Sequence, residues 1–202
     1  RVASLAGEKV HAMGFLGGFS GEYIRLMLLQ QGIEAEFTEI EAETRSCINV
    51  RDLSTGKHTE LLEPGAPITE KDLERFLKQY EAILPKSDVV TISGSSPVGT
   101  PINFYKKLVL LAKRAGKPVL LDTSGEMLAK GIQALPTMIK PNKEELSQLL
   151  GVSIHSRDQL IMAARKLHNM GIQIVAISLG KEGVIVAGNE GVWQGMTPDI
   201  PV

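Results

Sequence analysis

The amino-acid sequence predicts an α/β fold with a mainly parallel sheet and helices on both of its faces. Helical and strand-like periods alternate from residue 69 to residue 179, and such alternation is typical of parallel strands joined by helices. The predicted strands are short apolar runs, as expected of strands buried on both faces of a sheet. Glycine follows several of the predicted helices, where it readily adopts the positive φ angle that ends a helix.

The first elements are a strand over 9–15 and a helix over 20–31, with Ser20 as candidate N-cap and Gly32 as stop. Residues 1–7 resemble the end of a helix. Later helices are expected over 69–84, 101–115, 124–130, 142–150 and 156–170, and later strands over 88–93, 119–122, 138–140 and 174–179. Capping pairs support three helix starts: Thr69 with Asp72, Asn142 with Glu145, and Ser156 with Gln159.

The segment from Ala35 to Pro64 shows no helical period. It holds strand-like runs over 36–40, 46–53 and 58–62, with Ser54–Lys57 as a hairpin turn. We therefore expect a small antiparallel sheet over residues 35–65, inserted in an α/β body formed by 1–34 and 66–202. The insertion is a lid over a site, a dimerisation surface or an edge decoration. The lid gains support because α/β proteins usually place function on loops and excursions at strand ends.

Composition narrows the class of protein. The chain has 202 residues, 43% hydrophobic and 22% charged, which is enough for one substantial core. Its net charge is −1 and it has no long basic run, so small molecules are favoured as partners over nucleic acid or a membrane surface. The single cysteine, Cys47, is expected to be a buried thiol, and no apolar run has signal-peptide or membrane-spanning length. These features predict a cytoplasmic protein.

Three polar stretches follow predicted parallel strands, at the edge where open α/β sheets bind ligands. They are Ser93–Pro97, Lys140–Glu145 and Ser178–Gly183. Each alone would suit a plain turn, so their shared position carries the prediction of a site. In the last stretch, Gly180–Gly183 leads into the β-branched run 184–186 instead of a helix, which excludes a Walker-type phosphate loop. A turn whose backbone N–H groups also bind an anion remains open.

The pair Asn142 and Glu145 has two interpretations. Asn at the N-cap and Glu three residues later form a capping box, which is the favoured interpretation when the pair is taken alone. The same geometry suits a phosphate at the helix N-terminus, with Lys140 adding charge and Glu145 holding magnesium through water. The two roles can alternate.

Arg45 begins a predicted strand on which Arg45, Cys47, Asn49 and Arg51 share one face by the two-residue period. An exposed arginine is usually solvated. If this face lines a cleft, its arginines would bind an anionic substrate group through bidentate hydrogen bonds. The four histidines, His11, His58, His155 and His168, show no metal-ligand spacing along the chain and are interpreted as structural or solvated.

Five stretches taken together point to a family. They are Gly14–Gly18, Thr44–Arg45, Ile92–Ser95, Lys140–Leu146 and Ser178–Gly183. In this order they resemble the ribokinase-like carbohydrate kinases of the PfkB family, and most of all the branch of 1-phosphofructokinase and tagatose-6-phosphate kinase. The resemblance spans nearly the whole chain and implies a ribokinase-like three-layer fold with a small antiparallel β lid.

The resemblance also implies roles for individual residues. ATP would be the co-substrate, and Mg²⁺ would be organised by Asn142 and Glu145, indirectly through water or phosphate. The positions that match the family's ATP and phosphate contacts are Lys140, Asn142, Ser178, Gly180, Lys181 and Gly183. The positions that match its sugar-phosphate contacts are Arg45, Ser93, Gly94 and Ser95, and Arg51 is a further candidate. The lid often builds a dimer in this family, so a homodimer through residues 35–65 is expected.

Two of the family's motifs have no counterpart in these 202 residues. One is an amino-terminal sugar-binding segment with an Asp and a Gly-Gly-Lys-Gly-x-Asn stretch, and the other is the Gly-Ala-Gly-Asp or Gly-Ser-Gly-Asp motif that carries the general base. Both ends of the sequence look cut, and Pro198–Val202 resembles the entry to another element, so we expect these motifs before Arg1 and after Val202. The 202-residue chain alone is then expected to be inactive.

The leading hypothesis is ATP-dependent phosphoryl transfer to a hydroxyl of a ketohexose phosphate, driven by positioning and charge neutralisation. Two alternatives remain: a kinase of an unphosphorylated sugar or nucleoside, and a non-catalytic regulator that binds nucleotide or sugar. A Rossmann-type oxidoreductase is disfavoured, because no G-x-G-x-x-G joins a strand to a helix. The pattern leaves the sugar phosphate open.

Overall fold

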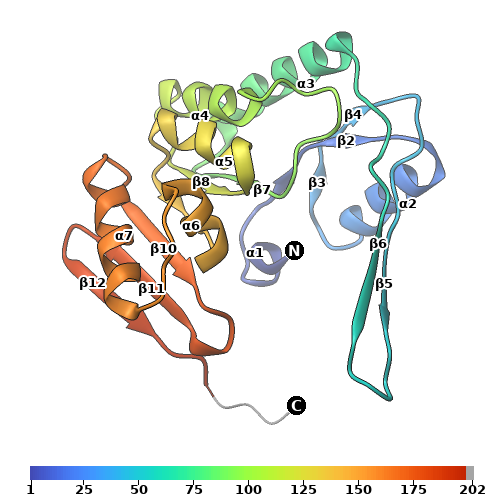
Figure 1. The fold of residues 1–202 in the computed structure, drawn as a ribbon. Coiled ribbons are helices and arrows are strands. Elements are labelled where there is room, and N and C mark those ends of the chain that lie inside the picture. Colours follow the sequence, from blue (N-terminus) through green and yellow to red (C-terminus); the bar gives the residue numbers. More distant parts are fainter. Residues whose placement is uncertain (199–202) are drawn as a thin grey trace. The chain divides into compact units, whose positions relative to one another are not determined.

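The computed structural model describes residues 1–198 and divides the chain into two compact units (Figure 1). The first unit comprises Arg1–Ile83 and Pro97–Thr100, and the second comprises Leu84–Ser96 and the chain from Pro101 onward. The element expected to begin after Pro198 falls on residues outside the described range. In the described part of the chain, no helix has the length and apolar character needed to span a membrane.

The second unit is built on a six-stranded sheet with the order β12-β11-β10-β9-β8-β7. Its strands are β7 (Val90–Ser93), β8 (Val119–Asp122), β9 (Met138–Ile139), β10 (Ile174–Ser178), β11 (Val184–Gly188) and β12 (Gly191–Gly195). The strands β7, β8, β9 and β10 are parallel to one another, whereas β11 is antiparallel to both β10 and β12. The expected strands over 88–93, 119–122, 138–140 and 174–179 are confirmed with small shifts of their ends.

Helices connect these parallel strands (Figure 1). They are α4 (Phe104–Arg114), α5 (Gly125–Gly131), α6 (Lys143–Leu150) and α7 (Arg157–Asn169), with short 3₁₀ turns η1 (Leu84–Lys86), η2 (Ile132–Ala134) and η3 (Gly180–Glu182). Buried aliphatic side chains alternate along the strands, as Val119 and Leu121 do on β8. Fully buried helix residues such as Leu146 and Leu167 also belong to the core of this unit.

The first unit begins with α1 (Val2–Leu5) and two parallel strand pairs. The pairs are β1 (His11–Ala12) with β3 (Glu34–Ala35), and β2 (Phe15–Leu16) with β4 (Thr38–Glu39). The run 36–40 was expected in the antiparallel insertion, but its central residues pair in parallel with β2 instead, so that expectation was wrong. The reason is burial: Thr38 is 1% exposed, and its hydroxyl bonds to Gln79.

Two helices complete this unit, α2 (Gly18–Leu29) and α3 (Glu70–Ile83). Helix α2 starts two residues before Ser20, with Gly17 as N-cap, so Ser20 is not the cap. Phe76 of α3 stacks on Phe15 with 4.9 Å between ring centroids, which ties α3 to the strand β2. Aromatic pairs of this kind add stability beyond the apolar area that they bury.

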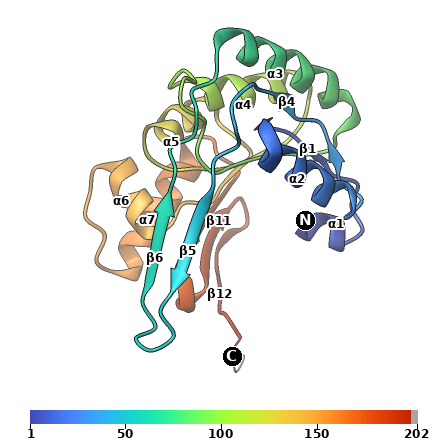
Figure 2. The same cartoon turned by 90° about the vertical axis from the view of Figure 1, so that its right-hand side faces the viewer.

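The inserted hairpin consists of β5 (Cys47–Arg51) and β6 (His58–Leu62), which are antiparallel with Ile48 opposite Leu61 (Figure 2). The expected hairpin turn is confirmed: Gly56 has φ +70°, and Asp52 N donates to Lys57 O at 2.9 Å. Every residue of both strands is exposed. Cys47 is therefore an exposed thiol, and the expectation of a buried one was wrong.

Candidate functional site

The loops after the four parallel strands of the second unit lie along one edge of the sheet, because parallel strands end on the same side. Hydrogen bonds link each loop to the next. Gly94 N donates to Asp122 O at 2.9 Å, and Lys140 N donates to Leu121 O at 3.4 Å. Ser178 N donates to Pro141 O at 3.1 Å. The three stretches predicted from sequence are therefore brought together, with the loop after β8 between the first two.

The loop after β7 is held through the carbonyl group of Gly94. Gly94, at φ +83°, accepts hydrogen bonds from the Thr123 hydroxyl at 2.8 Å and the Tyr105 hydroxyl at 3.2 Å. Thr123 is 7% exposed. Burial raises the pKa of Tyr105, so its hydroxyl keeps the proton that it donates. The backbone of Ser93–Ser95 is thus fixed at the edge, and its two serine side chains are exposed.

Lys140 and Asp122 form an ion pair on neighbouring strands, with 3.2 Å between Nζ and Oδ1. Both side chains are about one third or more exposed, at 42% and 34%. Exposed pairs of this kind contribute only about 0–1 kcal/mol, so an anionic ligand can exchange for the carboxylate at small cost. The carboxylate of Asp122 therefore positions the Lys140 ammonium without locking it.

Asn142 and Glu145 form the capping box of α6. Asn142 Oδ1 accepts from Glu145 N at 2.9 Å, and Asn142 N donates to Glu145 Oε2 at 2.8 Å. The capping interpretation is confirmed. The two side chains also lie at the sheet edge, because Asn142 forms a parallel bridge with Ser178.

The stretch Ser178–Gly183 is a tight turn between β10 and β11. Leu179 N donates to Gly183 O at 2.8 Å, and both glycines have positive φ, +59° at Gly180 and +92° at Gly183. A Cβ on Gly183 would lie 2.0 Å from Gly195 O, so only glycine fits there. Lys181 O accepts from the Thr197 hydroxyl at 2.5 Å. The backbone at Gly180 has open space around it, as a ligand-facing turn requires.

In the first unit, the glycine stretch and the Thr-Arg stretch of the sequence also meet. The Thr44 hydroxyl bonds to Gly17 N at 2.9 Å and Gly17 O at 3.0 Å. Glu43 accepts from Ser20 N at 2.6 Å and Phe19 N at 3.1 Å. These bonds lower the pKa of the Glu43 carboxyl, with the Ser20 bonds as the main cause. The carboxylate occupies the start of α2, a position that attracts anions.

The two predicted substrate arginines belong to this first unit. Arg45 precedes β5 instead of beginning it, and its Nη1 atom donates to Glu63 O at 3.4 Å. Arg51 ends β5 opposite His58 and is exposed. Their contact with a sugar phosphate stays a prediction.

Sequence reasoning missed three residues that organise these loops: Glu43, Asp122 and Thr123. A signal was available for one of them. Asp122 ends an apolar strand run, in the same way as the polar residues that the pattern did single out. The partners of Glu43 lie more than twenty residues away along the chain, and no local pattern marks this residue.

The fold and the loop-lined sheet edge define an α/β protein of the kind that binds small molecules at strand ends. Residues 1–198 match the family described as pfkB family carbohydrate kinase, and the chain belongs to this family. Its fold is accordingly the ribokinase-like α/β fold.

The 1-phosphofructokinase of Bacillus subtilis (strain 168) is 36% identical over 187 residues, or 93% of this chain. The chain spans 60% of the length of that relative. The tetrameric inhibited form of phosphofructokinase-2 from Escherichia coli superposes with a TM-score of 0.89 at 26% identity, over 98% of this chain and 66% of that one. A possible 1-phosphofructokinase from Thermotoga maritima superposes with a TM-score of 0.86 at 31% identity, over 94% and 61%.

Proposed function

We propose that the protein transfers the γ-phosphoryl group of ATP to a hydroxyl of a ketohexose phosphate. One structural observation supports this function: hydrogen bonds join the loops that follow the parallel strands into one continuous edge. The chain also belongs to the pfkB carbohydrate kinases. The similarity to the Bacillus subtilis 1-phosphofructokinase supports a phosphorylated ketohexose as the acceptor. We propose a cytoplasmic location, because the exposed thiol of Cys47 suits a reducing compartment.

The nucleotide would lie along the second unit's sheet edge. Lys140 would exchange its Asp122 partner for a nucleotide phosphate, since the ion pair is weak and exposed. The Ser178–Gly183 turn would present its backbone to the nucleotide. Ser93, Gly94 and Ser95, with Arg45 and Arg51, would contact the sugar phosphate.

Magnesium fits the oxygen donors of Asn142 and Glu145. Mg²⁺ binds oxygen ligands and keeps several of its waters, so a carboxylate that already caps a helix can still hold the ion through water. The carboxylate of Glu145 uses its Oε2 atom for the cap. When bound, the ion would neutralise charge on the nucleotide phosphates.

Two matched pairs of variants test the nucleotide site by calorimetry with Mg²⁺ and ATP. Asn142→Ala and Ser156→Ala each remove a capping box from a helix of the second unit, and each should lower the free energy of unfolding by about 1 kcal/mol. Only Asn142→Ala should also weaken Mg-ATP binding.

The second pair tests the charge of Lys140. Lys140→Met should weaken Mg-ATP binding by roughly tenfold or more, because a charged hydrogen bond to phosphate contributes about 1.5–3 kcal/mol. Lys166→Met, in the last turn of α7, is the matched control and should leave Mg-ATP binding unchanged.

The acceptor is tested with the complete protein, by measuring ATP consumption with fructose 1-phosphate, fructose 6-phosphate, tagatose 6-phosphate, ribose and fructose. A marked preference for one phosphorylated ketohexose supports the proposal. Turnover of ribose or fructose instead would overturn the acceptor assignment, and ATP binding without any turnover would favour a regulator.

We further propose that the protein forms a homodimer through the hairpin β5–β6. Ile48 is 54% exposed, and Leu61, its register partner, is 55% exposed. An exposed antiparallel pair with apolar side chains is prone to pair with another chain, which makes the hairpin a candidate contact between subunits.

A further inference from the structure

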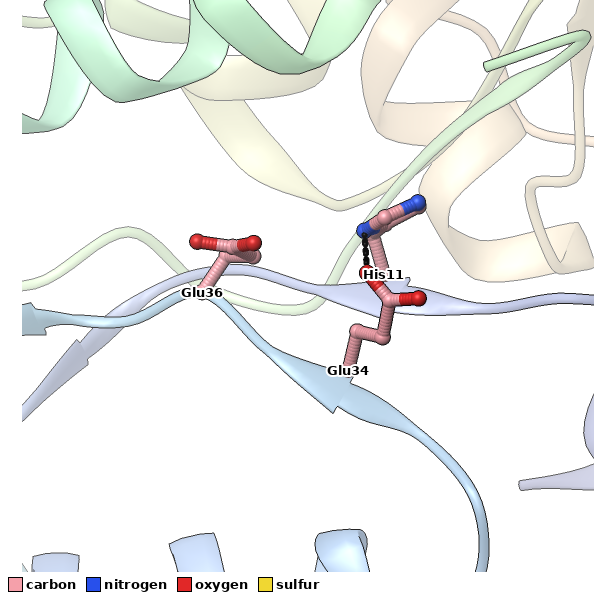
Figure 3. Close-up of side chains that lie close together, drawn as sticks. All are labelled: His11, Glu34 and Glu36. Atoms are coloured by element: carbon pink, nitrogen blue, oxygen red, sulfur yellow. Dashed lines mark ion pairs between the residues drawn. The ribbon is translucent and has the colours of Figure 1, made fainter. Parts of the chain in front are cut away.

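A group of three metal-ligand side chains lies in the first unit, in a part of the molecule that the proposed function does not use. His11, Glu34 and Glu36 each offer one ligand atom, and these atoms all lie within 4.8 Å of one another. Figure 3 shows the imidazole of His11 and the two carboxylates on the same side of the strands. Spacing along the chain cannot reveal this group, because more than twenty residues separate His11 from Glu34.

The parallel pairing of β1 and β3 creates the group. His11 and Glu34 are register partners, so their side chains project from the same face of the pair. Glu36 lies two residues beyond Glu34, and its backbone N–H donates to Ala12 O at 2.8 Å, which continues the pairing. The two-residue period places the Glu36 carboxylate on the same face. The backbone therefore places all three side chains on one face of the strand pair before any ion arrives.

The imidazole of His11 gives a second, independent indication that an ion binds here. Its side chain is only 8% exposed, and its Nδ1 atom is buried without a hydrogen-bond partner in the described residues. Glu34 Oε2 lies 3.1 Å from this nitrogen as an ion-pair contact, but the two do not align as a hydrogen bond. A buried polar atom without a hydrogen bond is costly, and a neutral imidazole offers Nδ1 as a metal ligand when its proton is on Nε2.

We propose that His11, Glu34 and Glu36 bind a divalent transition-metal ion of the zinc type, which joins β1 to β3. One imidazole nitrogen and two carboxylate oxygens suit Zn²⁺ or Co²⁺, with water in the fourth position. Mg²⁺ is disfavoured, because it prefers an octahedron of oxygens and keeps its water. Bonds of about 2.1 Å place tetrahedral ligand atoms roughly 3.4 Å apart. The three ligand atoms lie within 4.8 Å of one another, so the group must close by up to about 1.4 Å, through rotation of the half-buried glutamates.

Lys9 competes with this ion. Its Nζ atom lies 2.9 Å from Glu34 Oε1, and its side chain is 74% exposed. A metal ion must displace this ammonium or share the carboxylate with it. Because an exposed ion pair contributes at most about 1 kcal/mol, removal of the charge should tighten metal binding by up to about fivefold.

The test uses the 202-residue chain with Cys47→Ser, which removes the exposed thiol as a competing zinc ligand. After treatment with a chelator, the protein is titrated with Zn²⁺ in a calorimeter and with Co²⁺ in a spectrophotometer, and its melting temperature is measured with and without Zn²⁺. His11→Gln and Glu36→Gln should each weaken Zn²⁺ binding by more than about tenfold and abolish the zinc-dependent rise in melting temperature. His155→Gln, at an exposed histidine elsewhere in the chain, should change neither quantity.

Lys9→Met keeps the test decisive if His11→Gln fails to fold. Tighter Zn²⁺ binding in Lys9→Met, together with its loss in Glu36→Gln, supports the proposal. The proposal is overturned if no Zn²⁺ binds the Cys47→Ser chain, which would leave the cluster as an ion pair only. It is also overturned if Zn²⁺ binds equally well to Glu36→Gln and Lys9→Met. None of these outcomes depends on nucleotide binding, so the proposed function can fail while the metal site stands.

Discussion

The two glycines in the turn after β10, Gly180 and Gly183, both have positive φ, but they differ in the space that is available for a side chain. A methyl group on Gly183 would lie 2.0 Å from the backbone oxygen of Gly195, and the strand pairing between β11 and β12 leaves that oxygen no room to move. A methyl group on Gly180 would meet nothing within 4 Å. Gly180 therefore needs glycine only for its conformation, whereas Gly183 needs it for space as well.

We expect Gly183→Ala to lower the free energy of unfolding by at least about 3 kcal/mol, because backbone strain and a backbone clash add. Gly180→Ala should lower it by roughly 1–2 kcal/mol, the usual penalty for a left-handed residue with a Cβ. Urea unfolding of both variants measures the difference. Equal effects would show that the β11–β12 hairpin relaxes around the new methyl group.

At the scale of one element, helix α3 begins with an acid-sensitive cap. Asp72 Oδ2 accepts from Thr69 N at 2.9 Å and from the Thr69 hydroxyl at 2.6 Å, and Arg75 Nη2 lies 2.6 Å from Asp72 Oδ1. These contacts lower the pKa of Asp72 from 3.8 to about 2. The hydrogen bond from the Thr69 hydroxyl is the largest cause, and the hydrogen bond from Arg75 is the next. The charged carboxylate therefore stabilises the folded state.

The sign of the pH dependence follows from this lowered pKa. The stabilisation is fully present above pH 3.8 and is lost as the pH falls toward about 2, where the folded carboxyl also takes up a proton. The difference in unfolding free energy between wild type and Asp72→Asn should thus be largest near neutral pH and should shrink through this window. Urea unfolding at several pH values measures it. A difference that does not change with pH would contradict the assignment of the cap.

At the scale of the whole molecule, the proposed dimer makes a simple prediction. Ile48→Lys places a charge on the exposed apolar face of the hairpin, and it should shift the protein from dimer to monomer in analytical ultracentrifugation. Met162→Lys is the matched control, because Met162 is 70% exposed on α7 in the second unit. The hairpin assignment fails if both variants keep the wild-type sedimentation coefficient, or if only Met162→Lys dissociates the protein.

Much of this molecule follows from local sequence patterns. The capping boxes of α6 and α7 were predicted because both partners of each box lie within four residues, and helix geometry alone brings them together. The Ser54–Lys57 turn and the strands β7, β8 and β10 are local in the same sense. The shared edge of the strand-end loops was predictable as well, because parallel strands end on the same side of a sheet.

Tertiary structure decided the contacts whose partners lie far apart. Ser20 was the better N-cap by residue type, but α2 starts at Gly18. The Thr44 hydroxyl accepts from Gly17 N, and the Glu43 carboxylate accepts from the N–H groups of Phe19 and Ser20. Residues 36–40 have a strand pattern that suits either orientation, and burial of Thr38 selected the parallel partner β2. Cys47 is exposed because the hairpin leaves both of its faces open in the described structure.

The sequence by itself determined the class of fold, the caps and the family motifs, because each depends on residues that are neighbours along the chain or on a periodic pattern. Only the tertiary structure placed Asp122 beside Lys140, and only it brought His11 to Glu34 and Glu36. The physical reason is the same in both cases. Neighbouring parallel strands hold side chains within a few ångströms of one another whatever length of chain connects them, and their register cannot be deduced from local preference.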